Sequence, residues 1–314
     1  MKQESKLRNV RIIINPSSGK QIPVLAILSD AMKEGGLEWE VAVSKEKGDA
    51  LRLAKEAIAN GVDIVAVYGG DGTLSEAAGA FIGSDVLLFI LPGGSANVLA
   101  TELGIPKDLK EALQLLCSDS LEVQSVDIAR FNDCYSLVRA GLGFEAEMVH
   151  EADREIKKKL GVFAYFYSAA AAFKKTKHVR YQIKIDGEEH FVNGWTCVVT
   201  NAGSLGFANI SLDKKIDVSD GLLDVLVVRK ANLSFVNHVL ATLIRRERRE
   251  NFELVKHWQG KHIQVKTSQQ QVVQCDGEAL GKVPFDIRVI PGAIKVLRPK
   301  VVVESGEKTP KHVN

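Results

Sequence analysis

Short apolar runs alternate with amphipathic stretches over the N-terminal third of the chain. Four runs are rich in aliphatic and β-branched residues, as expected of strands buried within a sheet. They are Val10–Asn15, Glu38–Val43, Val62–Tyr68 and Val86–Leu91. The stretches at about residues 21–34 and 48–60 have the length and pattern of helices. Strands that alternate with helices in this way predict a parallel sheet covered on both faces, in a Rossmann-like α/β domain.

The rest of the chain has a different pattern, in which short period-2 or β-branched runs are separated by turn residues. SVDIARF, GWTCVVTN, LLDVLVVRK and KVPFDIRVIPGAIKVL are examples. This pattern is typical of an antiparallel β-sandwich. Two stretches, at about residues 147–175 and 233–255, interrupt it and predict helical insertions. The predicted fold class is therefore α/β plus all-β, with a first domain at 1–124 and a second at 125–295.

Three of the predicted parallel strands end in turns rich in glycine and serine. The turns are NPSSGK at 15–20, YGGDGT at 68–73 and LPGGSAN at 91–97. Parallel sheets bind ligands at the carboxyl ends of their strands. Glycine lets main-chain N–H groups approach a ligand, and a helix N-terminus carries partial positive charge. Each turn alone could be a plain turn, but three at one sheet edge predict a cradle for a polyphosphate.

Two common phosphate-binding motifs do not fit these turns. A Walker A loop would need a glycine in place of Ile14 and a serine or threonine after Lys20. The dinucleotide fingerprint G-x-G-x-x-G can be aligned on Gly70 and Gly72, but it meets Ser75 where the third glycine is required. The turns therefore predict a phosphate site of another kind.

Asp71 is unusual among these phosphate-seeking glycines. A carboxylate repels phosphate unless a divalent cation lies between them, so we expect Mg²⁺ to accompany the nucleotide. The alternative is that Asp71 or Thr73 merely caps the helix that follows.

Taken in order, NPSSGK, GGDGTLSE, PGGSAN and a late DGE resemble the motifs of the diacylglycerol kinase catalytic superfamily. Its bacterial lipid kinase branch is the most similar, and sphingosine and ceramide kinases are relatives. The resemblance extends to about Pro299, and it implies a nucleotide domain, a β-sandwich domain and a cleft where ATP and Mg²⁺ meet a lipid hydroxyl group. It also implies that residues from about 296 to 314 return to the first domain. GGDG alone also occurs in NAD kinases and phosphofructokinases.

Matched by position, the resemblance implies that the three turns and the end of the second strand bind ATP. The implied ATP-binding residues are Asn15, Pro16, Ser17, Ser18, Gly19, Ser44, Gly69, Gly70, Asp71, Gly72, Thr73, Leu74, Ser75 and Ser95. Three positions depart from the family: Ser75 replaces a common Asn, Ser95 keeps the usual hydroxyl group, and Val98 replaces a common Asp. The change at Val98 removes one member of a carboxylate–water–metal network.

The segment QCDGEAL contains Asp276 and Glu278 on a turn between apolar runs. The pair Asp276-Gly277 is typical of a tight hairpin, and we interpret DGEEHF at 186–191 as a plain hairpin too. A lipid hydroxyl group is a poor nucleophile and needs a base that accepts its proton. The resemblance implies that DGE supplies this catalytic base, and the sequence leaves Asp276 and Glu278 as alternatives.

The turn DVSDGLLDV contains three aspartates within eight residues: Asp217, Asp220 and Asp224. Their oxygens suit Mg²⁺, although a solvated turn would have the same composition. The resemblance implies a structural Mg²⁺ bound by the Asp220 side chain and the carbonyl groups of Asp217 and Leu222. It also implies that Asp127 joins Asp71 in the ATP–Mg²⁺ network, and the alternative for Asp127 is a polar strand residue that faces solvent.

Composition and charge narrow the function classes. Of the 314 residues, 46% are hydrophobic and 25% charged, which is enough for two domains with sizeable cores. The net charge of +2 and the lack of a broad basic stripe argue against nucleic acid as a partner. The four cysteines are scattered without a C-x-x-C pair, which favours a reducing compartment. The N-terminus lacks the apolar core of a signal peptide, so we expect a cytoplasmic protein.

Two stretches bear on contact with a membrane. The run Leu160–Phe173 is shorter than the ~20 residues that span a bilayer and has basic flanks. It predicts either a core helix or the wall of a lipid cleft. The cluster RRERRE, Arg245–Glu250, predicts either a solvated face or a contact with anionic lipid. We therefore expect a peripheral, transient contact with the inner membrane face. The sequence does not decide whether the protein forms a homodimer.

The combined prediction is an ATP-dependent lipid kinase that uses Mg²⁺. It would transfer the γ-phosphoryl group to a hydroxyl group of a diacylglycerol-like or sphingoid lipid. One alternative is an NAD kinase, which shares GGDGT, but the Asn-Glu pair of that family's second motif occurs nowhere in this chain. The other alternative is a non-catalytic nucleotide- or lipid-binding regulator, motivated by Val98 and Ser75.

Overall fold

The computed structural model describes residues 9–18, 22–131, 134–143, 178–203, 216–229, 255–276 and 278–300. Outside them lie Gly19, the run Leu160–Phe173, the basic cluster Arg245–Glu250 and both predicted helical insertions, except that Val255 begins a strand. Within the described part of the chain, no helix has the length and apolar character needed to cross a membrane.

The N-terminal half contains the predicted parallel sheet, with strands in the order β2-β1-β3-β4. Its strands are β1 (Asn9–Ile14), β2 (Glu38–Val43), β3 (Ile64–Gly69) and β4 (Leu87–Pro92). The four predicted strands are thus confirmed, with ends that differ by two residues or fewer. β2 and β3 pair with opposite edges of β1, so right-handed crossovers put the two intervening helices on opposite faces of the sheet.

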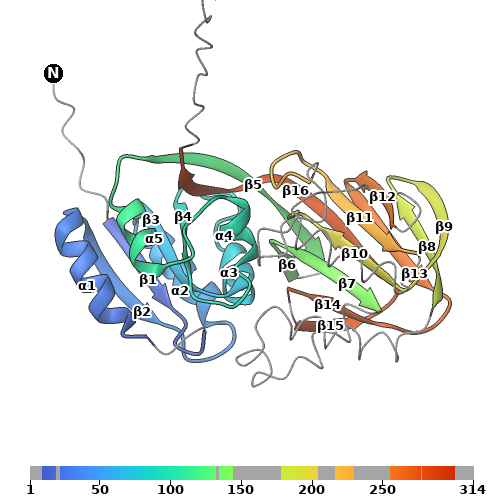
Figure 1. Ribbon diagram of the computed structural model, residues 1–314, viewed down its shortest axis with the longest axis horizontal. Helices are drawn as coiled ribbons and strands as arrows, with labels where there is room; N and C mark the ends of the chain where they lie inside the picture. The colour runs from blue at the N-terminus through green and yellow to red at the C-terminus, as the bar shows by residue number, and fades with distance from the viewer. Residues whose placement is uncertain are drawn as a thin grey trace, which may run out of the picture.

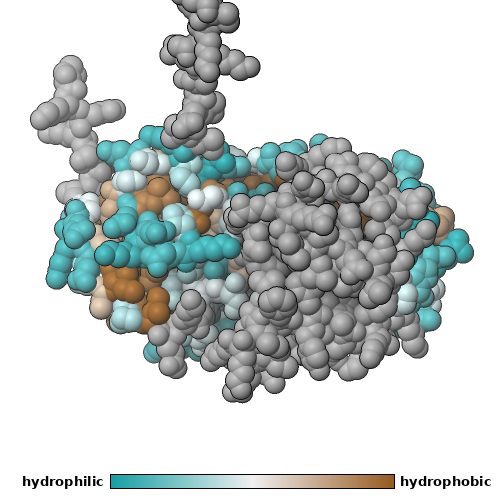
Figure 2. All heavy atoms as spheres, viewed as in Figure 1, coloured by the Kyte–Doolittle hydropathy of each residue, from teal (hydrophilic) through white to brown (hydrophobic). Residues whose placement is uncertain are grey.

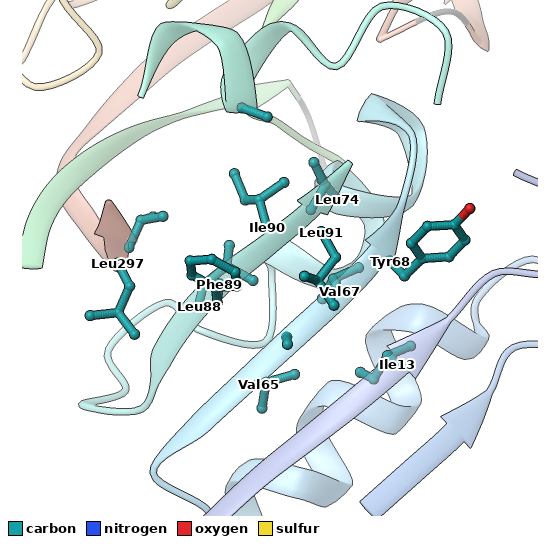
Figure 3. Close-up of a cluster of buried hydrophobic side chains, with 14 of the residues drawn as sticks. Ile13, Val65, Val67, Tyr68, Leu74, Leu88, Phe89, Ile90, Leu91 and Leu297 are labelled. Carbon is teal, nitrogen blue, oxygen red and sulfur yellow. The ribbon is translucent and has the colours of Figure 1, made fainter. Parts of the chain in front are cut away.

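Five helices of the described chain surround this sheet (Figure 1). They are α1 (Val24–Gly35), α2 (Asp49–Ala59), α3 (Asp71–Ala78), α4 (Val98–Glu102) and α5 (Leu109–Leu116). α1 packs against α5, and α2 packs against α3. The strands form the centre of the core because they are covered on both sides: all six residues of β3 are buried. Figure 3 shows Val65, Val67, Leu88 and Phe89 at this centre.

The C-terminal half contains two antiparallel layers. One continues the first sheet beyond β4 as β16-β13-β8-β9, with β5 and β6 attached to β16, and the other has the order β12-β11-β10-β7-β14-β15. The strands are β5 (Leu121–Phe131), β6 (Cys134–Ser136), β7 (Arg139–Gly143), β8 (Val179–Ile185), β9 (Glu188–Gly194), β10 (Thr196–Thr200), β11 (Leu223–Val228), β12 (Val255–Gly260), β13 (His262–Thr267), β14 (Val272–Cys275), β15 (Glu278–Lys282) and β16 (Phe285–Pro299). A second core fills the space between the layers. The predicted α/β plus all-β class is confirmed.

Both predicted hairpins are present. Ile185 pairs with Glu188 across a two-residue turn, where Asp186 and Gly187 both have positive φ. Cys275 pairs with Glu278, and Asp276, which follows Cys275, also has positive φ. The primed turns that suit such hairpins require positive φ, which Asp and Gly tolerate better than other residues.

Two long strands, β5 and β16, join the halves (Figure 1). They pair with each other along most of their length, with a register shift between Ile290 and Ile294. Near its end β16 also gains a parallel neighbour, since Val296 pairs with Leu88 of β4. The domain limits of 1–124 with 296–314, and of 125–295, stay a prediction, since both strands run from one half into the other.

The surface of the N-terminal half is mixed in character. Figure 2 shows apolar side chains exposed among hydrophilic ones on this part of the molecule. Leu25 and Val43 are exposed large apolar residues of this half. Scattered exposure of this kind is ordinary for a folded protein and does not by itself mark a binding site.

Candidate active site

The three turns predicted to form a phosphate cradle lie side by side at the carboxyl edge of the parallel sheet. The Asn15 side chain donates a hydrogen bond from Nδ2 to Thr73 Oγ1, at 2.8 Å. The main-chain N–H of Asn15 bonds to the carbonyl of Tyr68 at 2.9 Å, and that of Gly93 bonds to the carbonyl of Gly69 at 2.9 Å. Each turn is therefore bonded to the central turn after β3.

The closest approach is between the second and third turns, at Gly70 and Gly94. A Cβ atom on Gly94 would lie 2.6 Å from the Gly70 Cα, a distance that backbone atoms do not tolerate. Asn97 closes the third turn: its Oδ1 accepts from the Gly94 N–H, and its Nδ2 donates to the Gly94 carbonyl, both at 2.8 Å. Glycine is needed at position 94 because the two backbones touch.

Asp71 is the first residue of α3, but its carboxylate serves the neighbouring helix. Oδ1 accepts the N–H of Val98, the first residue of α4, at 2.7 Å. No side chain caps α3 itself at its N-cap residue, Gly70. The alternative that Asp71 or Thr73 caps α3 is therefore wrong, because Asp71 reaches across to the third turn instead. Burial, and next the charge of Asp276, raise the pKa of Asp71.

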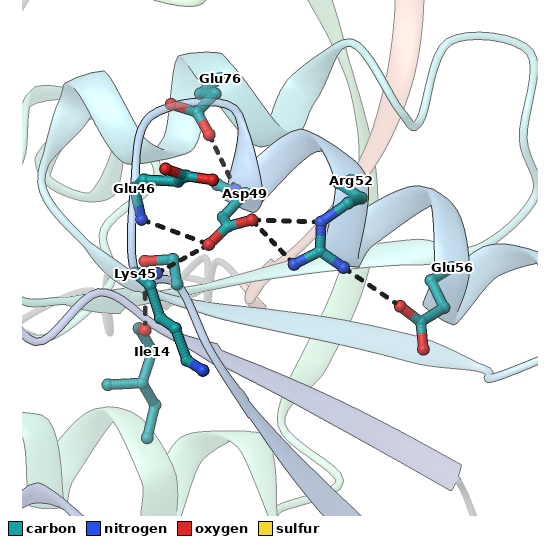
Figure 4. A network of polar contacts seen from close by, with 9 residues as sticks. Ile14, Lys45, Glu46, Asp49, Arg52, Glu56 and Glu76 are labelled. Carbon is teal, nitrogen blue, oxygen red and sulfur yellow. Dashed lines mark hydrogen bonds and ion pairs between the residues drawn. The ribbon is translucent and has the colours of Figure 1, made fainter.

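The turn after β2 is attached to the same edge (Figure 4). Ser44 is buried and bonds to the carbonyl of Ile14 through its N–H at 2.9 Å. Asp49 holds the turn together by accepting the N–H groups of Lys45 at 2.8 Å and Glu46 at 3.2 Å. These bonds, led by that from Lys45 and followed by that from Arg52, lower the pKa of Asp49 to about 2.

Glu76, in the middle of α3, completes this network. Its Oε1 accepts the N–H of Ala50, in the first turn of α2, at 2.8 Å. Asp49 and Glu76 were not among the predicted site residues. The available signals were an acidic residue at the start of an apolar helix and the glutamate that ends GGDGTLSE. Their bonds tie the turn after β2 to α2 and α3.

Asp276 reaches from the C-terminal half to α3. It sits on the β14–β15 hairpin with φ 47°, and its Oδ2 accepts the Ser75 hydroxyl at 2.5 Å. The N–H of Arg139 donates to Oδ1 at 2.9 Å, and that of Leu137 donates to Oδ2 at 3.3 Å. Burial raises the pKa of Asp276, while the bonds from Ser75 and Arg139 act in the opposite direction. Glu278 begins β15, and its side chain lies outside the described part.

The predicted metal residues of the second half form a separate group. Asp127, on β5, accepts the N–H of Gly221 on Oδ2 and that of Gly292 on Oδ1, both at 2.6 Å. Asp220 accepts the N–H of Leu222 at 2.9 Å. Burial, followed by the charges of nearby aspartates, Asp224 first, raises the pKa of Asp220. The described contacts thus place Asp127 with the Asp220 turn rather than with Asp71.

The side chains in this group do not form a metal cage by themselves. Across the described ranges, no three His, Cys, Asp or Glu side chains converge as metal ligands. Asp217 accepts the N–H and the hydroxyl of Ser219, at 2.9 Å and 2.7 Å. The buried Asp224 lies 2.5 Å from Nε2 of His257. A cation here would need main-chain carbonyl oxygens or water as further ligands.

The predicted site residues therefore form two separate groups in the structure. The cradle brings together the turns that contain Asn15, Ser44, Gly69–Ser75 and Ser95, and the C-terminal half adds Asp276 to it. Ser17 and Ser95 are exposed, whereas Ser75 is buried against Asp276. The second group consists of Asp127, Asp217, Asp220 and Leu222.

Comparisons with known proteins identify both halves of the chain. The model of the diacylglycerol kinase catalytic domain matches residues 9–131, and that of the YegS C-terminal NAD kinase beta sandwich-like domain matches residues 137–298. An uncharacterized protein of Synechocystis is 31% identical over 268 residues, 83% of this chain but only 61% of the length of that relative. A Bacillus subtilis diacylglycerol kinase is 28% identical over 304 residues, 95% of this chain and 99% of the relative.

Solved structures give the same result. The crystal structure of a diacylglycerol kinase from Bacillus anthracis superposes with a TM-score of 0.76 and 26% identity. The match covers 96% of this chain and 100% of that one.

Proposed function

The chain belongs to the family of bacterial lipid kinases with a diacylglycerol kinase catalytic domain, and we propose that it transfers the γ-phosphoryl group of ATP to a hydroxyl group of a diacylglycerol-like lipid. One observation carries the proposal: the partly buried carboxylate of Asp276 meets α3 at the edge of the glycine cradle, through the 2.5 Å contact with Ser75. A proton acceptor and a phosphate cradle thus lie next to each other.

ATP would bind along the three turns. The N–H groups around Gly69–Gly72 precede the N-terminus of α3, where partial positive charge favours phosphate. The exposed hydroxyl groups of Ser17 and Ser95 are free to face the nucleotide from the other two turns. The Asp49 and Glu76 bonds keep the fourth turn, with Ser44, in register with the cradle.

The residues present fit Mg²⁺ at two places. At the cradle, Asp71 uses one oxygen for the Val98 N–H, and its raised pKa marks a carboxylate that a cation would stabilise. At the second place, Asp220 lies among aspartates that raise its pKa, and the carbonyl groups of Asp217 and Leu222 would complete the set. When bound with ATP, Mg²⁺ neutralises phosphate charge.

We assign the base to Asp276 rather than Glu278. Oδ1 of Asp276 accepts the N–H of Arg139 at 2.9 Å, and its second lone pair can accept the proton of the lipid hydroxyl group. Asp276→Asn and Glu278→Gln should be tested separately. The assignment requires that Asp276→Asn abolishes turnover while ATP still binds, and that Glu278→Gln keeps the greater share of activity.

The test of the function is direct. The protein is incubated with labelled ATP, Mg²⁺ and one acceptor at a time: diacylglycerol, a sphingoid base, ceramide or NAD. Labelled lipid in the diacylglycerol reaction is the expected result, and a sphingoid product would change the substrate class. NADP formation, or ATP binding without any labelled product, would replace the proposal with the corresponding alternative.

A transient contact with a membrane surface and a homodimer belong to the same proposal. Sedimentation with anionic vesicles and light scattering of the purified protein test them. Neither outcome affects the assignment of the cradle.

A further inference from the structure

The contact between Ser75 and Asp276 joins residues that are 201 positions apart and belong to different halves of the protein. Ser75 lies on α3, inside GGDGTLSE, and Asp276 lies on the β14–β15 hairpin. Both side chains are shielded from solvent: Ser75 is 8% exposed, and burial is the leading influence on the pKa of Asp276. A hydroxyl–carboxylate bond in such surroundings is stronger than one in water.

We propose that Ser75 is a positioning residue for phosphoryl transfer, which holds the Asp276 carboxylate in one orientation so that Oδ1 is left to accept the proton. This inference rests on the proposed function. It departs from the role that the family resemblance implies for position 75, which is contact with the nucleotide.

The hydrogen bonds of the carboxylate account for the orientation. Oδ2 accepts two donors, the Ser75 hydroxyl at 2.5 Å and the Leu137 N–H at 3.3 Å, so both of its lone pairs are used. Oδ1 accepts only the Arg139 N–H among these donors, at 2.9 Å. Without Ser75 the carboxylate would lose the shortest of these three bonds, which together fix the plane of its two oxygens.

The backbone on both sides is also held. The N–H of Asp276 donates to the Arg139 carbonyl at 3.0 Å, and the N–H of Arg139 donates to Oδ1 of Asp276, so one main-chain bond and one side-chain bond link the two residues. Ser75 is flanked by Leu74, Ala77 and Ala78, which are all buried, so the helix cannot slide to follow a displaced carboxylate. A proton acceptor fixed in this way does not need to reorient during the reaction.

The hydroxyl oxygen of the lipid forms a bond to the γ-phosphorus while the bond from that phosphorus to the β–γ bridging oxygen breaks, and ADP leaves. The hydroxyl proton passes to Oδ1 of Asp276. Ser75 neither gains nor loses a proton, so its effect should appear in the rate of the step rather than in substrate binding.

The test compares Ser75→Ala, Ser75→Thr and a matched control, Thr196→Val. Thr196 is buried in β10, and its hydroxyl donates to the Leu142 carbonyl at 2.6 Å, away from the cradle. We expect Ser75→Ala to lower kcat at least tenfold, because a well-placed base contributes ~100-fold or more. KM for ATP and for lipid should stay within about twofold. Ser75→Thr should restore most of kcat, and Thr196→Val should leave kcat unchanged.

Three results would overturn the inference. They are an unchanged kcat in Ser75→Ala, a rise in the KM for ATP with kcat unchanged, and a failure of Ser75→Thr to recover activity while it remains folded. If the wild type phosphorylates no lipid, the proposed function fails first, and the contact itself is tested by unfolding. Ser75→Ala, Asp276→Asn and the double variant should then shift the urea midpoint non-additively, and additive shifts would refute the contact.

Discussion

Replacing Gly94 by alanine tests whether the nucleotide turns touch as closely as the structure requires. The added Cβ would lie 2.6 Å from the Gly70 Cα and 2.9 Å from Asn97 Oδ1. Gly70 makes the same contact from the other side, yet a Cβ there would lie 3.4 Å from the Gly94 Cα. The distance from the new Cβ to the opposite Cα is thus about 0.8 Å shorter in Gly94→Ala than in Gly70→Ala, and the two turns would have to separate by that amount to remove the difference.

This overlap sets the expected magnitude. Added methyl groups in a packed site cost about 1–3 kcal/mol when backbone must move, so we expect Gly94→Ala to lower the free energy of unfolding by that amount. Gly70→Ala should cost less than half as much, because Gly70 has φ −91° and alanine adopts that conformation. Urea denaturation followed by circular dichroism, without nucleotide, measures both variants.

Activity provides a second measurement on the same variants. A displacement of this size at a reacting centre can cost up to ~100-fold in rate, so kcat/KM of Gly94→Ala should fall by about tenfold or more. Unfolding of Gly94→Ala at the wild-type urea concentration would show that the two turns do not touch. Equal destabilisation by Gly70→Ala and Gly94→Ala would show that the contact is not asymmetric in solution.

Three further substitutions test other contacts by urea denaturation. Asp49 has its pKa lowered to about 2, so its carboxylate stabilises the fold above the ordinary pKa of 3.8 and loses that contribution as the pH falls toward 2. Asp49→Asn should flatten this part of the pH dependence, and an unchanged slope would contradict the assignment. Asp127→Ala should cost about 2–5 kcal/mol because the N–H groups of Gly221 and Gly292 lose their acceptor, with Asp127→Asn milder. Asp108 caps α5 through two N–H groups, so Asp108→Ala should cost about 1 kcal/mol and Asp108→Ser much less; equal losses would count against the cap.

The parallel sheet was predictable because its strands are buried on both faces. A strand such as β3, with six buried residues, needs apolar residues along its whole length. A crossover helix is also needed before the next parallel strand, and it gives the sequence a second recognisable pattern. The turns at its edge were equally visible, since only glycine and small polar residues suit them. The sequence therefore predicts the edge of the sheet at which the turns meet.

The contacts across the molecule were not predictable in the same way. No spacing rule relates Ser75 to Asp276, because their separation depends on every strand between them. The alternating pattern of β16 carries no sign that Val296 pairs in parallel with β4, and only the family resemblance implied a return to the first domain there. Asp71 was read as a partner of phosphate and cation, and its bond to the Val98 N–H depends on how two separate turns meet.

The position of β16 beside β4 has a consequence for synthesis of the protein. The nucleotide half has all four of its own strands once β4 has left the ribosome, but the free edge of β4 has no partner until the last strand of the described chain emerges. A growing chain consequently exposes an unpaired apolar edge while the whole second half is being made, which is the condition under which nascent proteins recruit chaperones. Chains halted before Phe285 should be cleaved by protease within the first half, and chains released after Pro299 should resist.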